Sequence, residues 1–477
     1  MNSSSSVMAP FFANQSCDPF QPTSRPCELG NYVRYAVDAS SVPDIQAAVD
    51  FARQNNIRFV IRNTGHDYLG RSTGAGALAV WTHHLKSIDF SDYESADYSG
   101  KAVRLGAGVQ GFEIMQAARD QGLVVVGGEC PTVGLAGGYT QGGGHSALSS
   151  SFGLSADNTL AWEVVLADGT FVIASRTENP DLFWALSGGG GSTYGIVVSM
   201  TVKAFSDAVF SGATLSFFTS DNPSDRFFAG IQAFHESLPS IVDAGTMVVY
   251  YFTDTFFMIS PVNAYNKTQA EVEQIMAPLI ASLGSLEVVY SVSYSESKNY
   301  YDHYDTYFGP LPLGNIQVGI AQYGGRLIPR SVVANISDTM QSIVKQSVTW
   351  IGVGTNVAPF GNSLTNSVHP AWREALVHTT LTTPWNFTAP WEDMIALQDK
   401  MTNVILPELE AVTPGSGAYV NEADFRQPNF QDTFWGTNYE RLLTIKKRYD
   451  PHDMLYARAG VGSESWIVSQ EGRMCRS

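Results

Sequence analysis

The stretch that decides the fold is Gly127-Gly128-Glu129-Cys130-Pro131-Thr132-Val133-Gly134, followed closely by the glycine-rich run of residues 137–145. A second glycine-bracketed loop, Arg62-Asn63-Thr64-Gly65-His66-Asp67, lies upstream. Glycine at this density is destabilising unless the backbone needs a positive φ or must approach another group closely. Each loop also carries one nucleophilic side chain, His66 or Cys130. We therefore expect the two loops to hold a flat, phosphorylated ligand.

These loops resemble those of the berberine-bridge-enzyme-like branch of the FAD-linked oxidases, which have the p-cresol-methylhydroxylase-type FAD-binding fold. In that branch the histidine of the first loop bonds to the 8α-methyl carbon of the flavin, and the cysteine of the second bonds to ring carbon 6. The resemblance implies bicovalent FAD on His66 and Cys130. Imidazole and thiolate are nucleophiles able to add to an electrophilic ring. Taken singly, the two residues could be a loop histidine and a buried apolar cysteine.

The resemblance implies further cofactor contacts around these loops. Backbone N–H groups of the first loop would cradle the pyrophosphate, because concave rows of N–H groups bind anions. The other expected cofactor-binding residues are Arg62, Asn63, Thr64, Gly65, Asp67, Gly134, Gly138, Gly142, Gly143, Gly144, His145, Asp157, Asn158, Gly195, Ile196 and Asn421.

The segment Tyr419-Val420-Asn421-Glu422 supplies the candidate bases. Plant members of the family place a catalytic tyrosine after the Asn of a Tyr-x-Asn-Tyr segment, and the matching position here holds Glu422. On a strand, Glu422 would point away from Asn421, and burial in a cleft would raise its pKa towards a useful general-base value. Two alternatives stay open: Glu422 pairs with a cation such as Arg426, or Tyr419 or a tyrosine of the second domain is the base.

Val133 lies three residues beyond Cys130. In this family a valine at that position accompanies fast reaction of the reduced flavin with dioxygen, whereas a larger aliphatic side chain closes a small pocket over the ring. The resemblance therefore implies that dioxygen is the electron acceptor, although Val133 could be an ordinary core residue.

The pattern of elements predicts an α+β fold in three segments. Residues 1–206 resemble the first part of the family's FAD-binding domain, and the spacing of apolar residues predicts a helix at 42–53. Residues 207–416 are richer in Phe, Tyr and alternating strands, as at 247–252, and resemble the family's substrate-binding domain, an antiparallel sheet backed by helices. Residues 417–477 return to the FAD-binding domain and carry the berberine-bridge-like segment.

Three other signals need an interpretation. Residues 106–111 match the G-x-G-x-x-G dinucleotide fingerprint, with Glu129 near the position of a ribose-binding acid. No parallel βαβ run follows, so we expect only a turn that enters a helix. The adjacent pair His83-His84 lacks further ligands at a suitable spacing, and we expect no metal. Two His-bearing aromatic stretches, 300–305 and 367–373, could line a substrate pocket or pack within the second domain.

Composition limits the partners. The net charge of −17 and the pI near 4.9 argue against nucleic acid and against an anionic membrane surface, and no apolar run is long enough to span a membrane. We expect a monomer that acts on a small molecule and dioxygen. The function that the resemblance implies is hydride removal from a specialised metabolite, with release of hydrogen peroxide. A secreted alcohol or carbohydrate oxidase is the alternative.

Cysteine usage bears on the compartment. With Cys130 on flavin, Cys17 and Cys27 remain as a short-loop pair, and Cys475 is left near the terminus. A Cys17–Cys27 disulfide would indicate the secretory pathway or an extracellular location, whereas two reduced thiols would leave a cytosolic location open. The first residues lack the features of a signal peptide, so a secreted protein would begin here after its signal. Asn-X-Ser/Thr sequons give weak support for secretion, and they lie at Asn2, Asn14, Asn266, Asn335 and Asn386.

Overall fold

The structure is a computed structural model that describes residues 10–13, 16–17, 22–24, 26–316, 319–469 and 472–477. The opening residues and the sequons at Asn2 and Asn14 lie outside this part of the chain. The three sequons within it, at Asn266, Asn335 and Asn386, are exposed. None of the helices in the described residues is both long and apolar enough to cross a membrane.

The first part of the chain builds two larger sheets and a two-stranded one, which pairs β6 (Leu123–Val124) with β10 (Phe205–Ser206). A small parallel sheet has the order β1-β3-β2, and α2 (Val42–Gln54) follows its first strand. A five-stranded antiparallel sheet has the order β4-β5-β9-β7-β8. The strands are β1 (Tyr35–Asp38), β2 (Phe59–Arg62), β3 (Leu78–Trp81), β4 (Ile88–Glu94), β5 (Ser99–Gly106), β7 (Thr159–Val165), β8 (Phe171–Ser175) and β9 (Ile196–Lys203).

The G-x-G-x-x-G segment leaves β5 and enters α3 (Gly111–Arg119). Both neighbours of β5 are antiparallel to it, so the parallel arrangement of a dinucleotide-binding fold is absent around this strand. The prediction of a simple turn into a helix is confirmed.

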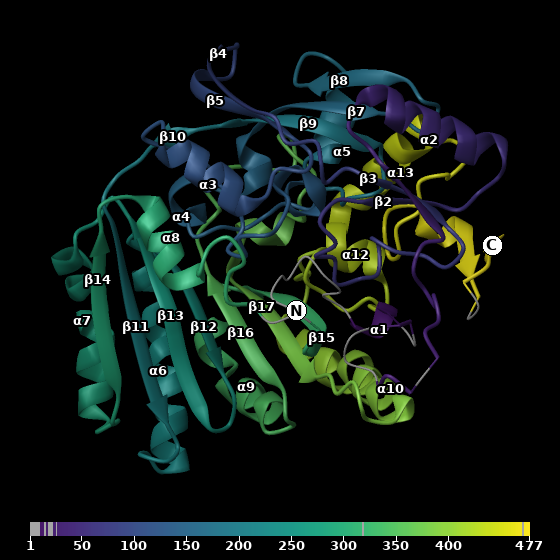
Figure 1. The fold of residues 1–477 in the computed structure, drawn as a ribbon. Coiled ribbons are helices and arrows are strands. Elements are labelled where there is room, and N and C mark those ends of the chain that lie inside the picture. Colours follow the sequence, from purple (N-terminus) through teal and green to yellow (C-terminus); the bar gives the residue numbers. More distant parts are fainter. Residues whose placement is uncertain (1–9, 14–15, 18–21, 25, 317–318, 470–471) are drawn as a thin grey trace.

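A seven-stranded antiparallel sheet fills the middle of the chain, in the order β14-β11-β13-β12-β16-β17-β15. Four helices, α6 (Ser224–Asp243), α7 (Gln269–Ser285), α9 (Ser337–Val344) and α11 (Leu406–Val412), pack their apolar residues against one face in a single core. Figure 1 shows α6, α7 and α9 beside the sheet. The strands are β11 (Phe210–Phe218), β12 (Met247–Phe252), β13 (Phe256–Tyr265), β14 (Ser291–Ser297), β15 (Ala321–Pro329), β16 (Thr349–Gly354) and β17 (Ala375–Pro384).

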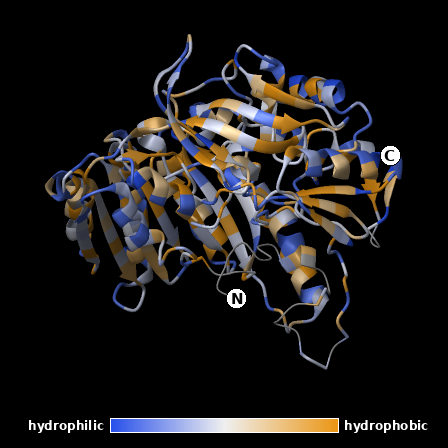
Figure 2. Cartoon of the chain, turned by 45° about the horizontal axis from the view of Figure 1, so that its top comes forward, coloured by the Kyte–Doolittle hydropathy of each residue, from blue (hydrophilic) through white to orange (hydrophobic). Residues whose placement is uncertain are grey.

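Alternation along these strands separates the core from the opposite face. In β12, Val248, Tyr250 and Phe252 belong to the core under the helices, whereas Val249 and Tyr251 line a cavity on the other side. Successive side chains of a strand point to opposite faces, so one strand can serve both purposes. The helices that cover the sheets show mixed blue and orange faces, as amphipathic helices do (Figure 2).

The C-terminal part returns to the first sheets (Figure 1, yellow). Residues of α12 (Phe430–Trp435) and α13 (Tyr439–Tyr449) share one core with residues of β5, β7 and α5 (Pro180–Leu186). The chain therefore forms a two-part unit with the seven-stranded sheet inserted between its parts, and the predicted α+β class is confirmed.

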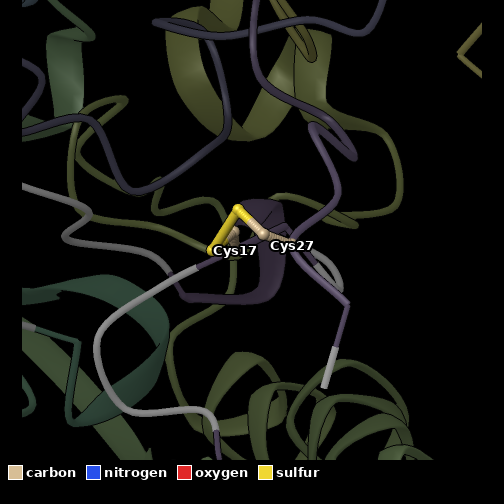
Figure 3. Close-up of a disulfide and its surroundings, with 2 residues drawn as sticks. All are labelled: Cys17 and Cys27. Atoms are coloured by element: carbon tan, nitrogen blue, oxygen red, sulfur yellow. A yellow bond between two sulfur atoms is a disulfide. The ribbon is translucent and has the colours of Figure 1, made fainter. Parts of the chain in front are cut away.

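The N-terminal segment carries the predicted disulfide between Cys17 and Cys27, close to the short helix α1 (Pro10–Ala13) (Figure 3). Phe11 and Phe12 of α1 pack on Phe425, which follows the candidate catalytic segment of residues 419–422. The remaining thiols are the buried Cys130 and the exposed Cys475.

Candidate active site

A cavity of about 860 Å³ lies where the two parts of the chain and the inserted sheet meet. Its walls come from the loops around His66 and Cys130, from the open face of the seven-stranded sheet, and from the segment around Glu422. These segments lie far apart in the sequence but line the same cavity, so they form one site.

The two predicted nucleophiles converge on one hydroxyl group. Nε2 of His66 lies 2.8 Å from Oγ1 of Thr132, and Sγ of Cys130 lies 3.6 Å from the same oxygen. Burial, the largest effect, lowers the pKa of His66 to about 3, so the imidazole is neutral and nucleophilic at neutral pH. His66 and Cys130 both face the cavity, as two attachments to one flavin would require.

Hydrogen bonds hold the Cys130 loop against the start of α3. Nε2 of Gln110 donates to the carbonyl oxygen of Thr132 at 2.7 Å, and the backbone N–H of Gly111 donates to the carbonyl of Val133 at 2.9 Å. Glu113 accepts from the backbone N–H of Gln110 in a capping box that holds this helix end. The loop is thus positioned by a helix terminus rather than by its own sequence.

The cavity residues fit FAD. Oδ1 of Asn63 and Oε1 of Gln141 are buried with no hydrogen-bond partner among the described residues, and both side chains line the cavity. Buried acceptors of this kind are satisfied by a bound group that carries donors. A Cβ at Gly134 would lie 1.9 Å from Oδ1 of Asn63, so only glycine lets the two loops approach. Gly138 and Gly191 also lie close together along the wall.

Most of the predicted cofactor residues line the cavity. Besides the two nucleophiles they are Asn63, Thr64, Asp67, Gly134, Gly138, His145, Gly195 and Asn421, together with the candidate catalytic residues Val133, Tyr419 and Glu422. The other predicted positions do not line it: Arg62, Gly65, Gly142, Gly143, Gly144, Asp157, Asn158 and Ile196.

Several of these outlying positions support the wall from behind. Asp157 accepts from Arg373 at 2.7 Å and from Asn366 at 2.7 Å, and it anchors the second part of the chain to the first. Gly142 allows the side chain of Asn421 to approach, since a Cβ there would meet it at 2.5 Å. At these two positions the residue type also serves the packing of neighbouring segments.

Glu422 is held by two imidazoles. Its Oε1 lies 3.1 Å from Nε2 of His145, and its Oε2 lies 2.9 Å from Nε2 of His378. Nδ1 of His145 in turn lies 3.0 Å from Oε1 of Glu129. We call these four residues, Glu129, His145, His378 and Glu422, the acid–base cluster. Three of them line the cavity, and His378 lies behind Glu422.

Strand alternation and one glycine assemble the cluster. His378, Thr380 and Thr382 occupy alternate positions of β17, and the two threonines face the cavity. On the neighbouring strand, a Cβ at Gly325 would lie 2.0 Å from the carbonyl oxygen of Glu422. Glycine at this position lets the Glu422 segment lie against the sheet.

The cluster is strongly coupled, and the expected shift of Glu422 was wrong in sign. Burial alone would raise the pKa of Glu422, but the charge and hydrogen bonds of His145 and His378 together bring this pKa well below its usual range. Burial would likewise lower the pKa of His145, yet the carboxylates of Glu129 and Glu422 raise it well above its ordinary value. Burial dominates at His378 and lowers its pKa, so this imidazole is neutral.

The donor atoms of His145, His378 and Glu422 lie within 4.8 Å of one another, a spacing that a metal ion could use. Nδ1 of His378, however, is buried with no hydrogen-bond partner among the described residues. A metal-bound imidazole normally donates its second N–H to an acceptor. The hydrogen bonds therefore favour a proton-carrying group, and we assign no metal ligand here.

Other expectations for this segment were also wrong. Residues 419–422 form a turn instead of a strand, with the N–H of Glu422 donating to the carbonyl of Tyr419 at 3.0 Å, so Asn421 and Glu422 both reach the cavity. Arg426 pairs with Asp399, which excludes the ion pair with Glu422. Burial raises the pKa of Tyr419 far above its usual value, which makes it a weak candidate base.

Aromatic and aliphatic side chains line part of the cavity wall. Tyr68 and Tyr323 stack with ring centroids 3.9 Å apart. Beyond this pair the lining side chains include Val249, Tyr251, Phe308, Ile316, Ile320, Ile351 and Val353. Of the two His-bearing stretches, 367–373 lies outside the lining, and Tyr304 of 300–305 supports the cavity from behind by donating to the carbonyl of Gly128 at 2.7 Å.

Sequence reasoning missed Glu129, His378, Thr132 and the two stacked tyrosines. Glu129 stands beside Cys130, and an acid next to a nucleophile was a usable signal. No signal in the sequence pointed to His378, because a histidine within a strand of residues 207–416 is usually a packing residue.

The fold and the site define a flavin-dependent oxidoreductase, and comparisons with known proteins agree. Residues 33–175 match the family described as "FAD binding domain", and residues 418–462 match "Berberine and berberine like". The chain is 64% identical over 475 residues to "FAD-linked oxidoreductase ZEB1" of Gibberella zeae, covering 100% of this chain and 84% of that protein. It is 40% identical over 488 residues to "Bifunctional decalin synthase calF" of Penicillium decumbens, covering 100% and 84%.

Among solved structures, the VAO-type flavoprotein MtVAO615 from Myceliophthora thermophila C1 matches with a TM-score of 0.95 and 41% identity, over 99% of this chain and 87% of that one. The chain belongs to the berberine-bridge-enzyme-like FAD-linked oxidoreductases, with the p-cresol-methylhydroxylase-type FAD-binding fold. It is an FAD-dependent oxidoreductase, as predicted.

Proposed function

We propose that the protein is an oxidase with bicovalent FAD, which oxidises a hydroxyl-bearing specialised metabolite and passes the electrons to dioxygen. The observation that carries the proposal is the single cavity that receives His66, Cys130 and the carboxylate of Glu422. When bound, FAD supplies the hydride acceptor and the site of reoxidation by dioxygen. For an alcohol the reaction balances as alcohol plus dioxygen giving carbonyl compound plus hydrogen peroxide.

His66 and Cys130 would hold the cofactor from two loops. The neutral imidazole of His66 keeps a nucleophilic lone pair, and the hydroxyl of Thr132 orients its ring. Asn63 and Gln141 would accept hydrogen bonds from the cofactor through their unpaired buried oxygens. Two attachments would keep the ring fixed while one side of the cavity stays open to a bulky substrate.

Glu422 would take the proton of the substrate hydroxyl. Its side chain is 27% exposed and lines the cavity, while both of its oxygens are oriented by imidazoles. The stacked tyrosines and the aliphatic side chains of the open sheet face favour a substrate with a flat or apolar body. One relative is a decalin synthase, which is compatible with a metabolite of this kind.

The compartment and the domain division are part of the proposal. The Cys17–Cys27 disulfide and the exposed sequons at Asn266, Asn335 and Asn386 favour the secretory pathway. The division into residues 1–206, 207–416 and 417–477 follows the inserted sheet, whose strands run from β11 to β17.

The decisive experiment follows the cofactor through denaturation. Purified protein should be yellow, and its flavin should stay with the acid-precipitated chain. The single variants His66→Ala and Cys130→Ala should each keep one attachment, whereas the double variant should release FAD. Flavin that washes out of the denatured wild-type protein would contradict bicovalent attachment. A panel of phenolics, polyketides, alkaloid-like amines and sugars, scored by peroxide release, then identifies the substrate class.

A further inference from the structure

Glu129 is the one member of the acid–base cluster that the proposed chemistry leaves without a role. It directly precedes Cys130, its side chain is 15% exposed, and it lines the cavity. Its Oε1 lies 3.0 Å from Nδ1 of His145, whose Nε2 lies 3.1 Å from Glu422. The imidazole of His145 therefore bridges two carboxylates, one from the first part of the chain and one from the C-terminal part.

The hydrogen-bond pattern sets the charge of the cluster. Two carboxylates hold His145 by both ring nitrogens and raise its pKa well above the ordinary value, which favours an imidazolium with an N–H at each nitrogen. His378 is neutral because burial lowers its pKa. With two negative charges and one positive charge, the cluster is one proton short of neutrality. A buried group with net charge takes up a proton readily when this makes it neutral.

Few other groups share this environment. The tyrosines that face the cluster are Tyr68, Tyr139, Tyr300, Tyr304, Tyr323 and Tyr419, and burial raises the pKa of each, so all six are neutral near pH 7. Thr380 donates to Oε2 of Glu422 at 3.2 Å and carries no charge. The ring of Trp372 packs against His145 and His378 and adds no charge. Cys130 is adjacent to Glu129 in the chain.

We propose that the proton acceptor of the oxidation is the whole acid–base cluster, and that Glu129 is the positioning residue that gives it the net negative charge needed to take a proton. This inference rests on the proposed oxidase function. It explains how Glu422, alone a weak base between two imidazoles, can serve at neutral pH.

The proton balance is simple. The O–H bond of the substrate breaks and its proton goes to an oxygen of Glu422, while FAD, when bound, would supply the acceptor for the hydride that leaves the carbon. The cluster is then neutral. Because protonated Glu422 no longer attracts the imidazolium, His145 can pass its Nδ1 proton to Glu129, which faces the cavity and can release it there.

The test is the holoenzyme variant Glu129→Gln, which keeps the shape and a hydrogen-bonding group but removes one negative charge. Anaerobic flavin reduction by the substrate is measured across pH. We expect a rate at high pH lower by about tenfold or more. Without Glu129 the cluster binds its proton less tightly, so the rise of rate with pH should move to lower pH by about one unit. A matched control is Glu163→Gln, a carboxylate paired with Arg104 away from the cavity, which should change neither quantity.

A second measurement does not depend on turnover. In protein labelled with ¹⁵N-histidine, the signal lost in His145→Gln identifies His145 among the 9 histidines. Its titration midpoint should lie lower in Glu129→Gln than in wild type. The inference is overturned if the pH profile of flavin reduction, or the titration midpoint of His145, is the same in Glu129→Gln as in wild type. This holds even if the rate of flavin reduction is lower in the variant. Failure of the proposed function would look different, because no substrate would then reduce the flavin while the His145 midpoint still moved.

Discussion

At the scale of single residues, Glu422 is already engaged before a substrate arrives. His145 and His378 hold its two oxygens, and Thr380 adds a third donor. This arrangement keeps the carboxylate ionised and fixes its direction, and proton transfer at a short distance demands both.

Glu422→Gln keeps the shape of the side chain and removes its capacity to take a proton. We expect anaerobic flavin reduction by the true substrate to slow by about two to four orders of magnitude, which is the usual contribution of a general base. Stopped-flow absorbance of the flavin measures this rate. A variant that reduces its flavin at the wild-type rate, with an unchanged pH profile, would remove Glu422 from the mechanism.

Val133 lines the cavity and is only partly buried, as a residue that gates access to the ring would be. Val133→Leu adds one methylene group next to the expected position of the ring. We expect slower reoxidation of the reduced enzyme by dioxygen and little change in its reduction by substrate. Equal reoxidation rates in the two proteins would refute a gating role.

At the scale of elements, the site depends on how β15 and β17 present their backbones. The alternate positions of β17 bring His378 and Thr380 to the same face, and β15 places Gly325 against the Glu422 segment. The sheet therefore determines the position of a carboxylate that belongs to another part of the chain.

Gly325→Ala should displace Glu422, because the new Cβ would lie 2.0 Å from the carbonyl oxygen of that residue. We expect covalent flavin content close to wild type, because the nucleophiles lie on other loops, but flavin reduction slower by about tenfold or more. Gly284→Ala, at a position with open space around it, is the matched control and should leave the rate unchanged. Wild-type reduction by Gly325→Ala would show that the segment does not need this contact.

At the scale of the whole molecule, a buried lysine of the C-terminal part, Lys446, reaches the first part of the chain. Lys446 and Asp450 are each 1% exposed, with Nζ and Oδ2 2.5 Å apart. Nζ of Lys446 also donates to the carbonyls of Thr193 at 2.9 Å and Leu455 at 2.7 Å. This single cation therefore links segments that are far apart in the sequence.

Lys446→Met would leave Asp450 as a buried charge without its partner. We expect a loss of about 3–5 kcal/mol in the free energy of unfolding at pH 7, measured by urea denaturation. The neighbouring pair of Lys447 and Asp453 offers the control, because Lys447 is 44% exposed. Lys447→Met should cost about 1 kcal/mol or less. Similar losses in both variants would contradict the linking role of Lys446.

Features that depend on residues near one another in the sequence were predicted correctly, whereas a feature that depends on tertiary contacts was not. The helix at α2, the strand β12, the turn after β5 and the Cys17–Cys27 pair were predicted because hydrophobic period, glycine and short spacing are local signals. The strand expected at Glu422 was wrong, because tertiary contacts with Gly325 and the imidazoles override the local pattern.

The sequence by itself determined the class of fold, the FAD-binding segments and the two loops that carry His66 and Cys130, since glycine spacing and residue type are written along the chain. Only the tertiary structure decided the state of Glu422. Its partner His145 is 277 positions away and His378 is 44 positions away. The pKa of a carboxylate in a cavity depends on the charges and donors that surround it in space, and chain folding alone brings these together.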